Sequence, residues 1–175
     1  MAQSTIITDG SANNMTGEGG WCAIVRTNST ATNVSLIVEV TGYASKTTSN
    51  RMEMMAAIGG LSELQTSQTI DLISDSAYLL NTLKNKWYIQ WISDEEAWNA
   101  SSKRKKSYPR PNMDLWKTLI SLIEFHSVRF IKVKGHSGDY WNNRADKLAG
   151  IARKNKYGSR NWFPSFDNPL EGDFW

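Results

Sequence analysis

Four acidic residues of this chain could do chemistry together, and each stands in a short phrase of its own. They are Asp9 in TDGS, Glu53 in NRMEMMAAI, Asp75 in SDSAYLL and Asp146 in NNRADKLA. Carboxylate oxygens are the ligands that hard divalent cations such as Mg²⁺ and Mn²⁺ prefer. Two such ions side by side stabilise both the attacking and the leaving oxygen when a phosphodiester is cleaved. If the four acids converge, the sequence therefore indicates metal-dependent chemistry on phosphodiesters.

A histidine lies between the last two of these phrases. His136 stands in VKGHSGD, a polar stretch flanked by glycines. Such a loop does not belong in a hydrophobic core, and imidazole titrates in the pH range where a group that moves protons is useful. We therefore interpret His136 as a proton-transfer group, with a purely structural histidine as the alternative.

Each acid taken singly also has a structural explanation. Asp9 precedes a glycine, and Asp-Gly is a common turn pair. Glu53 follows Asn50 by three residues, as the acid of a helix capping box does. Asp75 and Asp146 stand where helices are expected to begin, and acids there interact favourably with the helix dipole. The joint arrangement favours the metal interpretation, because Asp9 and Asp75 both end segments that read as central strands.

The elements that must position these residues predict a mixed α/β domain. Apolar and alternating patterns indicate strands at 4–8, 21–26, 34–40, 69–74 and 128–133. Helical patterns cover 51–64, 76–83, about 86–93, 114–125 and 143–154. Three antiparallel strands followed by alternating helices and strands imply a mixed sheet with helices packed on its faces.

The composition is that of one globular domain of 175 residues, 40% of them hydrophobic. No run approaches the roughly 20 apolar residues that a membrane span needs, and the start lacks the pattern of a secretory signal. The single cysteine, Cys22, excludes an internal disulfide and a cysteine-based zinc cluster. We expect a cytoplasmic monomer.

Basic residues are concentrated in one polar stretch. Five of the 20 lysines and arginines form a basic cluster, made up of Lys103, Arg104, Lys105, Lys106 and Arg110. The stretch 94–111 is charged and broken by two prolines, so we expect a loop or protrusion there. A basic cluster of this kind contacts nucleic-acid phosphates, and the alternative is a solvated loop that keeps the protein soluble.

Taken together, the phrases make the chain resemble ribonuclease HI over roughly residues 2–154. TDGS, RMEMMAA, SDS, DLW, VKGH-x-G and N-x-R-A-D-x-L-A occur in this order. The resemblance implies a ribonuclease H-like α/β fold, with a five-stranded mixed sheet of three antiparallel strands and then parallel strands, flanked by helices. It implies one domain at 1–154, with a C-terminal tail at 155–175 outside the match.

The resemblance also implies an activity, the hydrolysis of the RNA strand of RNA–DNA hybrids to leave 5′-phosphate and 3′-hydroxyl ends. The implied mechanism uses two Mg²⁺ ions, with Mn²⁺ as a substitute. Asp9, Glu53, Asp75 and Asp146 would hold the ions, and Asp9 would be the shared ligand. His136 would relay protons around the attacking water or assist departure of the product.

Contacts to the RNA strand are implied position by position. Gly10 and Ser11 would lie along the RNA backbone near the metals, and Gly10 would allow close approach of a ligand because it has no side chain. Ser49, Asn50 and Ser76 would touch the hybrid in its minor groove. RNA is distinguished from DNA there through the 2′-hydroxyl group.

The DNA strand is expected to run over three tryptophans beside the basic cluster. These are Trp87, Trp91 and Trp98, and the alternative for them is packing in the core. Two departures from the family pattern concern the substrate. The loop after TDGS reads 14-NMTG-17 in place of an Asn-Pro-Gly turn, and Ala77 stands where a polar residue is often found, so it cannot make a polar contact to a base.

Two rival interpretations fit parts of the pattern. One is a nucleic-acid-binding module without catalysis, but such a module gains nothing from acids beside phosphate. The other is a domain of a reverse transcriptase or an integrase-like nuclease, whereas the basic cluster favours a free-standing enzyme. The tail, with its final DNPLEGDFW, is either a docking peptide for a partner protein or, as we favour, a segment that folds back over the domain.

Overall fold

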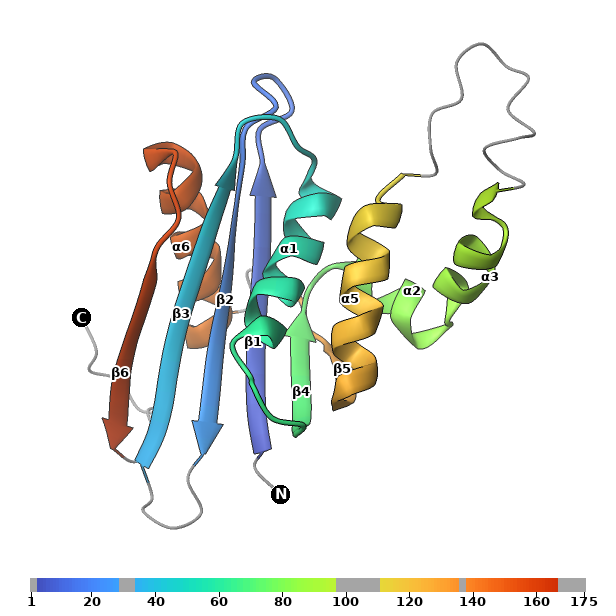
Figure 1. The fold of residues 1–175 in the computed structure, drawn as a ribbon. Helices are drawn as coiled ribbons and strands as arrows, with labels where there is room; N and C mark the ends of the chain where they lie inside the picture. The colour runs from blue at the N-terminus through green and yellow to red at the C-terminus, as the bar shows by residue number, and fades with distance from the viewer. Residues whose placement is uncertain (1–2, 29–33, 97–110, 136–137, 167–175) are drawn as a thin grey trace.

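A six-stranded mixed sheet forms the centre of the molecule (Figure 1). The computed structural model describes residues 3–28, 34–96, 111–135 and 138–166. The strands run in the spatial order β5-β4-β1-β2-β3-β6. Their bounds are β1 Gln3–Ala12, β2 Gly19–Asn28, β3 Val34–Ala44, β4 Thr69–Ser74, β5 Ser127–Lys132 and β6 Arg160–Phe166.

The pairing of the first five strands agrees with the sequence-based expectation. β1, β2 and β3 form an antiparallel meander. β4 pairs parallel to β1, and β5 pairs parallel to β4. The order places β1 and β4 side by side in the middle of the sheet, which is where the apolar character of both segments suggested they would lie.

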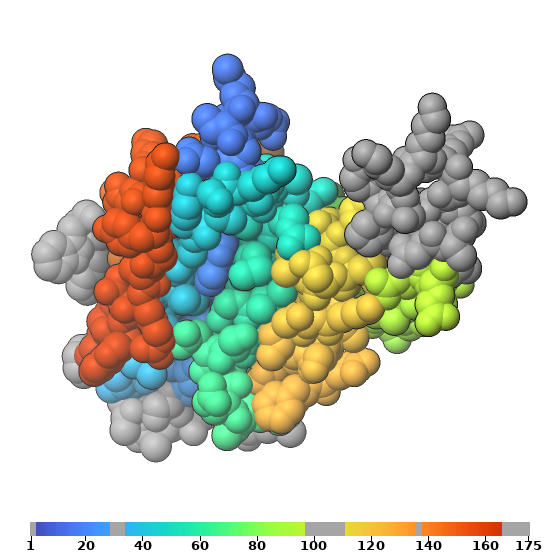
Figure 2. All heavy atoms as spheres, turned by 45° about the horizontal axis from the view of Figure 1, so that its top comes forward, coloured from blue at the N-terminus to red at the C-terminus, as the bar shows by residue number. Residues whose placement is uncertain are grey.

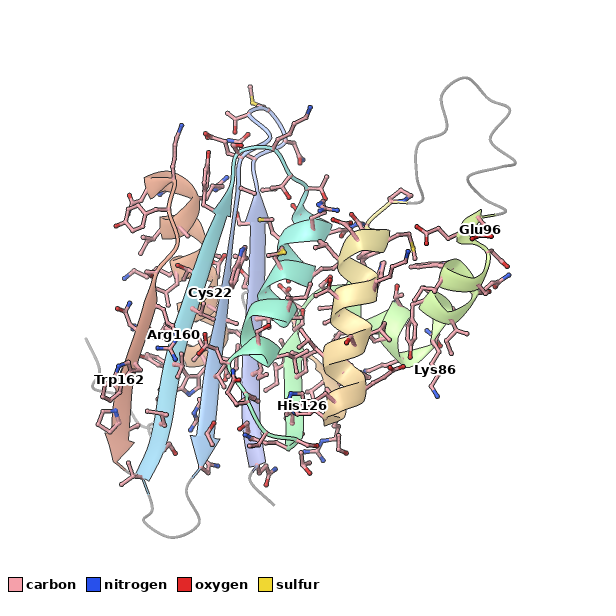
Figure 3. All side chains as sticks on the ribbon, viewed as in Figure 1. Cys22, Lys86, Glu96, His126, Arg160 and Trp162 are labelled. Carbon is pink, nitrogen blue, oxygen red and sulfur yellow. The ribbon has the colours of Figure 1, made fainter. Side chains whose placement is uncertain are left out.

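The expected number of five strands is wrong, because β6 adds a sixth. It runs antiparallel to β3, from Val34 opposite Phe166 to Val40 opposite Arg160. Two bonds besides the ladder hold its start, since the Arg160 guanidinium pairs with the Glu63 carboxylate at 2.8 Å and Thr41 N donates to Ser159 O at 2.8 Å. The tail therefore folds back at 160–166 (Figure 3), whereas the docking hypothesis stays a prediction for 167–175, outside the described residues.

The sequence does not signal β6 because the strand has no alternating pattern and contains Pro164. Proline cannot donate to a ladder and is tolerated mainly in edge strands. β6 is such an edge strand, and it covers an edge of β3 that would otherwise present unpaired backbone groups.

Helices cover both faces of the sheet. The described helices are α1 Ser49–Ser62, α2 Ala77–Lys84, α3 Trp87–Ser93, α5 Met113–Phe125 and α6 Tyr140–Asn155. On one face, α1, α2 and α5 bury their apolar residues against alternate side chains of the strands, among them Ile6. Ile7, the next residue of β1, points to the other face, where α6 packs Trp141 and two alanines against it. Among the described residues, no helix is long and apolar enough to cross a membrane.

Three helices have side-chain caps that the sequence did not predict. The N-cap residues are Thr48 for α1, Ser76 for α2 and Asp139 for α6. In each case the side chain accepts a hydrogen bond from the backbone N–H three residues later. α6 consequently begins at Tyr140, three residues before the start that its apolar pattern suggested. These caps decide how the acids of the candidate site are to be interpreted.

Candidate active site

Three carboxylates from three different elements converge at the C-terminal edge of β1 and β4. Asp9 lies near the end of β1, Glu53 lies on α1, and Asp75 directly follows β4. One oxygen of each lies within 4.8 Å of the others. Asp9 and Asp75 meet because the parallel register pairs Ile7 with Ile73, two residues before each acid. The expected adjacency of the two strands is thereby confirmed.

The fourth acid, Asp146, lines the same pocket from α6. The pocket has a volume of about 160 Å³, and its remaining lining residues are Thr8, Gly10, Val133, Gly135, Asn142 and Asn143. A water molecule in liquid takes up about 30 Å³, so ions with several coordinating waters fit here. The walls are supplied by the sheet edge, α1, α6 and the loop between β5 and α6, which no local stretch of sequence could bring together.

The capping explanations for the acids do not survive. Glu53 is the fifth residue of α1, and the cap of that helix is Thr48 rather than Asn50, so the capping-box interpretation is wrong. Asp75 precedes the cap of α2, which is Ser76. Asp146 is the seventh residue of α6 and therefore lies in the second turn, beyond the reach of a cap.

Burial and mutual repulsion make this acid cluster costly when it is fully ionised. Burial, followed by the charges of Asp75 and Asp146, raises the pKa of Asp9 to about 8. Burial, followed by the charges of Asp9 and Asp75, raises the pKa of Glu53 to about 9. Glu53 is only 8% exposed, and its buried Oε2 has no hydrogen-bond partner among the described residues. An all-oxygen, electron-rich set with an unsatisfied buried oxygen fits a hard divalent cation, which would compensate the charge.

Gly10 has a structural role that the sequence did not show. A Cβ at this position would lie 2.4 Å from the Glu53 backbone nitrogen and 2.5 Å from the carbonyl carbon of Met52. β1 therefore passes directly against the backbone of α1, and this contact sets the distance from Asp9 to Glu53. The expected approach of a ligand to Gly10 remains a prediction.

α6 is anchored so that its first two turns face the pocket. Glu39, a buried residue of β3, accepts hydrogen bonds from Arg144, with 3.0 Å between Nη2 and Oε2 and a second bond from Nε. Arg26 lies over the Trp141 ring at 4.9 Å from its centroid. Together with the buried alanine face, these contacts fix the rotation of the helix that carries Asp146.

Sequence reasoning missed Asn142 and Asn143, which line the pocket beside Asp146. A signal was present, since residues three and four positions before Asp146 lie on the same face of a helix. The apolar pattern predicts a helix that begins at residue 143, which leaves Asn142 outside it. Both asparagines offer an amide that can orient water or a phosphate oxygen.

The expected RNA contacts lie around the pocket in different environments. Ser11 is half-buried on β1, and Ser49 and Asn50 are exposed in the first turn of α1. The Ser76 hydroxyl accepts a hydrogen bond from Leu79 N at 3.2 Å, so it is already engaged as the cap of α2. Gly10 lines the pocket itself.

The tryptophans of α3 differ from each other. Trp87 is 48% exposed, whereas Trp91 is half-buried and packs on the core residue Trp116 with ring centroids 6.0 Å apart. Figure 2 shows α3 beside α5, on the side of the molecule away from α6.

His136, Trp98 and the basic cluster lie outside the described residues. The second histidine, His126, is buried at the other end of β5 and accepts a hydrogen bond from Gln68 N at 3.3 Å (Figure 3).

Comparison with known proteins gives a consistent result. The ribonuclease H family model matches residues 1–154. The chain is 42% identical over 150 residues to a ribonuclease H of Chlorobaculum parvum and 43% identical over 150 residues to one of Prosthecochloris aestuarii, covering 86% of this chain and 94% of each relative. Among solved structures, it superposes on LC9-RNase H1, a type 1 RNase H with the type 2 active-site motif, with a TM-score of 0.76, 22% identity and coverage of 93% of this chain and 77% of that chain. With this match and this carboxylate cluster, the chain belongs to the ribonuclease H family, a family of hydrolytic nucleases.

Proposed function

We propose that this chain is an endonuclease that hydrolyses the RNA strand of RNA–DNA hybrids and leaves 5′-phosphate and 3′-hydroxyl ends. The observation that carries the proposal is the convergence of Asp9, Glu53 and Asp75 within 4.8 Å, in a pocket that Asp146 also lines. Membership of the ribonuclease H family supports the substrate class. The observed helix caps support the proposal, because none of them is one of the four acids.

The four carboxylates would hold two Mg²⁺ ions, with Mn²⁺ as a substitute. When bound, two such ions supply Lewis-acid stabilisation of the attacking and leaving oxygens of the phosphodiester. Asp9 is assigned as the shared ligand because both Asp75 and Asp146 lie close enough to raise its pKa. Glu53 brings an oxygen that no other described group satisfies. His136, in the loop that leads from Gly135 into α6, is assigned to proton transfer.

The substrate would lie across the edge of the sheet that carries the pocket. Gly10 and Ser11 are assigned to the RNA backbone, and Ser49, Asn50 and Ser76 to the minor groove. These groups would recognise the 2′-hydroxyl groups of the RNA strand. Asn142 and Asn143, although not foreseen, are available in the pocket to orient the scissile phosphate.

The DNA strand would pass over α3 and the basic cluster. The exposed ring of Trp87 is the better contact, while Trp91, packed on Trp116, supports Trp87 with ring centroids 6.5 Å apart. The residues assigned to the same contact from the sequence, where they follow α3, are Trp98, Lys103, Arg104, Lys105 and Lys106. Contacts to phosphates position a duplex without reading its sequence, which suits an enzyme that recognises hybrids in general.

The catalytic domain is assigned to 1–154, with 155–175 as an extension, in a protein that works as a cytoplasmic monomer. The only cysteine, Cys22, is buried, and burial raises the pKa of its thiol, so it is poorly suited to form a disulfide between chains. Light scattering of the purified chain in dilute solution tests the monomer, and a mass of two chains would contradict it.

The proposal is tested by incubating the protein with end-labelled RNA–DNA hybrid, double-stranded RNA and double-stranded DNA, each with Mg²⁺ or with EDTA. We expect cleavage of the RNA strand of the hybrid alone, and only with Mg²⁺. The fragments should accept a 3′ extension, which requires a free 3′-hydroxyl. Binding of hybrid without any cleavage would instead support a binding module that has lost catalysis.

A further inference from the structure

The loop between β5 and α6 touches the candidate site through a glycine. A Cβ at Gly135 would lie 2.5 Å from Asp75 Oδ2, closer than two atoms can approach without one of them moving, and at an ordinary contact distance of 3.6 Å from its Cγ. The backbone of Gly135 does not lie in the left-handed region, unlike that of Gly17 and Gly138. Backbone conformation therefore does not require a glycine here, and the neighbouring carboxylate is the reason that a side chain does not fit.

The backbone on both sides of this contact is held in place. Val133 N, two residues before Gly135, donates to Ser74 O at 3.1 Å, which ties the loop to the residue that precedes Asp75. On the other side, Ser76 N donates to Ser74 Oγ at 3.1 Å. Because the two backbones are linked, the carboxylate end of Asp75 is the part that is free to turn.

A methyl group at position 135 would consequently displace the Asp75 carboxylate and leave the backbone of the loop and of β4 in place. The oxygen that it meets belongs to the side chain that lies within 4.8 Å of Asp9 and Glu53. Rotation of Asp75 away from the methyl group would remove one of three convergent ligands. Neither β4 nor α2 would have to move, since their caps and ladders do not involve the Asp75 side chain.

We propose that Gly135 is a positioning residue for Asp75, because its missing side chain lets the β5–α6 loop lie against the carboxylate and keep it directed at Asp9 and Glu53. The inference rests on the proposed function, in which Asp75 binds metal. It deepens that function because the loop that carries His136 in the sequence would also fix the position of the Asp75 carboxylate relative to Asp9 and Glu53. The loop and the metal ligands would then be coupled by direct contact.

The test compares Gly135→Ala with the matched variant Gly150→Ala. Gly150 lies in α6, and a Cβ there meets nothing within 4 Å. Mn²⁺ binding is measured by titration calorimetry, and the melting temperature is measured in EDTA. Loss of support for a metal ligand weakens metal affinity about 10–100-fold, so we expect a rise of this size in the Kd of Gly135→Ala. Its kcat on hybrid should fall in parallel at a fixed metal concentration, with KM for hybrid unchanged.

The melting temperature of Gly135→Ala in EDTA should be no lower than that of the wild type, because only a side chain has to turn. Gly150→Ala should match the wild type in Mn²⁺ affinity. An Mn²⁺ affinity of Gly135→Ala within about twofold of the wild type would overturn the inference. A second result would also overturn it. If Gly135→Ala lowered the melting temperature by the same amount in the wild type and in an Asp75→Ala background, the added methyl group would clash with a group other than Asp75. If the wild type itself neither bound Mn²⁺ nor cleaved hybrid, the proposed function would fail first.

Discussion

Replacing Glu53 by glutamine should stabilise the metal-free protein while destroying its metal site. Glu53 is 8% exposed, and burial, followed by the charges of Asp9 and Asp75, raises its pKa from 4.5 to about 9. Between these pH values the folded protein retains a proton that the unfolded chain releases. The stability that this group contributes is therefore fully present below pH 4.5 and is lost as the pH rises towards 9. Glutamine keeps the shape of the side chain but does not titrate.

The size of the effect follows from the raised pKa of Glu53. Each pH unit above the ordinary pKa of 4.5 lowers the free energy of unfolding of the wild type by about 1.36 kcal/mol. At pH 7 the wild type should therefore be about 3 kcal/mol less stable than Glu53→Gln. The free energy of unfolding should be measured by urea titration in EDTA at pH 5, 7 and 8. The advantage of Glu53→Gln should be small at pH 5 and should grow steadily to pH 8. Saturating Mg²⁺ should stabilise the wild type and leave the variant almost unchanged.

A matched control is Glu124→Gln, since Glu124 is an exposed residue of α5. It should change stability little at any of the three pH values. The reasoning would be refuted if Glu53→Gln were less stable than the wild type at pH 7 in EDTA. That result would mean that the carboxylate makes favourable contacts in the fold, and that its place in the cluster is structural.

Three further predictions test the site and its surroundings. Asp75→Asn should abolish cleavage with stability in EDTA unchanged or higher, and a loss of more than about 1 kcal/mol on urea titration would restore a capping role. Neutralising residues 103–106 should raise KM for hybrid and flatten its dependence on salt, so an unchanged salt slope would contradict contact with phosphate. Deleting 160–175 removes β6 together with the half-buried Phe163, and the lost burial should cost about 2 kcal/mol and roughly 4–8 °C in melting temperature. An unchanged melting curve would show that β6 adds no stability in solution.

Local patterns were sufficient to find every described helix and strand except β6, but they did not fix most of the ends. The strand at 69–74 is predicted with its observed bounds, because an apolar run ends at polar residues on both sides. The start of α6 is predicted three residues late, because Asp139 caps the helix before its apolar pattern begins. β6 is missed altogether, since its stability comes from pairing with β3 and not from any pattern of its own.

The acids themselves could be identified from the sequence, because each stands in a short recognisable phrase. The sequence alone could not decide whether these acids bind a metal ion or stabilise helix starts. As single residues, Glu53, Asp75 and Asp146 looked as much like helix-start residues as like ligands. The difference depends on which residue caps each helix, and caps depend on backbone geometry that shifts by one or more positions with tertiary packing.

The sequence by itself therefore determined the chemical inventory of this protein: four carboxylates, a histidine in a polar loop, a basic cluster and a family resemblance that the comparisons confirm. Only the tertiary structure decided that Asp9 and Asp75 meet, that the Glu53 oxygen is buried without a described partner, and that Gly135 touches Asp75. The reason is physical. Residue types and local periods are properties of short segments, whereas convergence depends on which strands pair, in which register, and how closely a helix or loop can approach them.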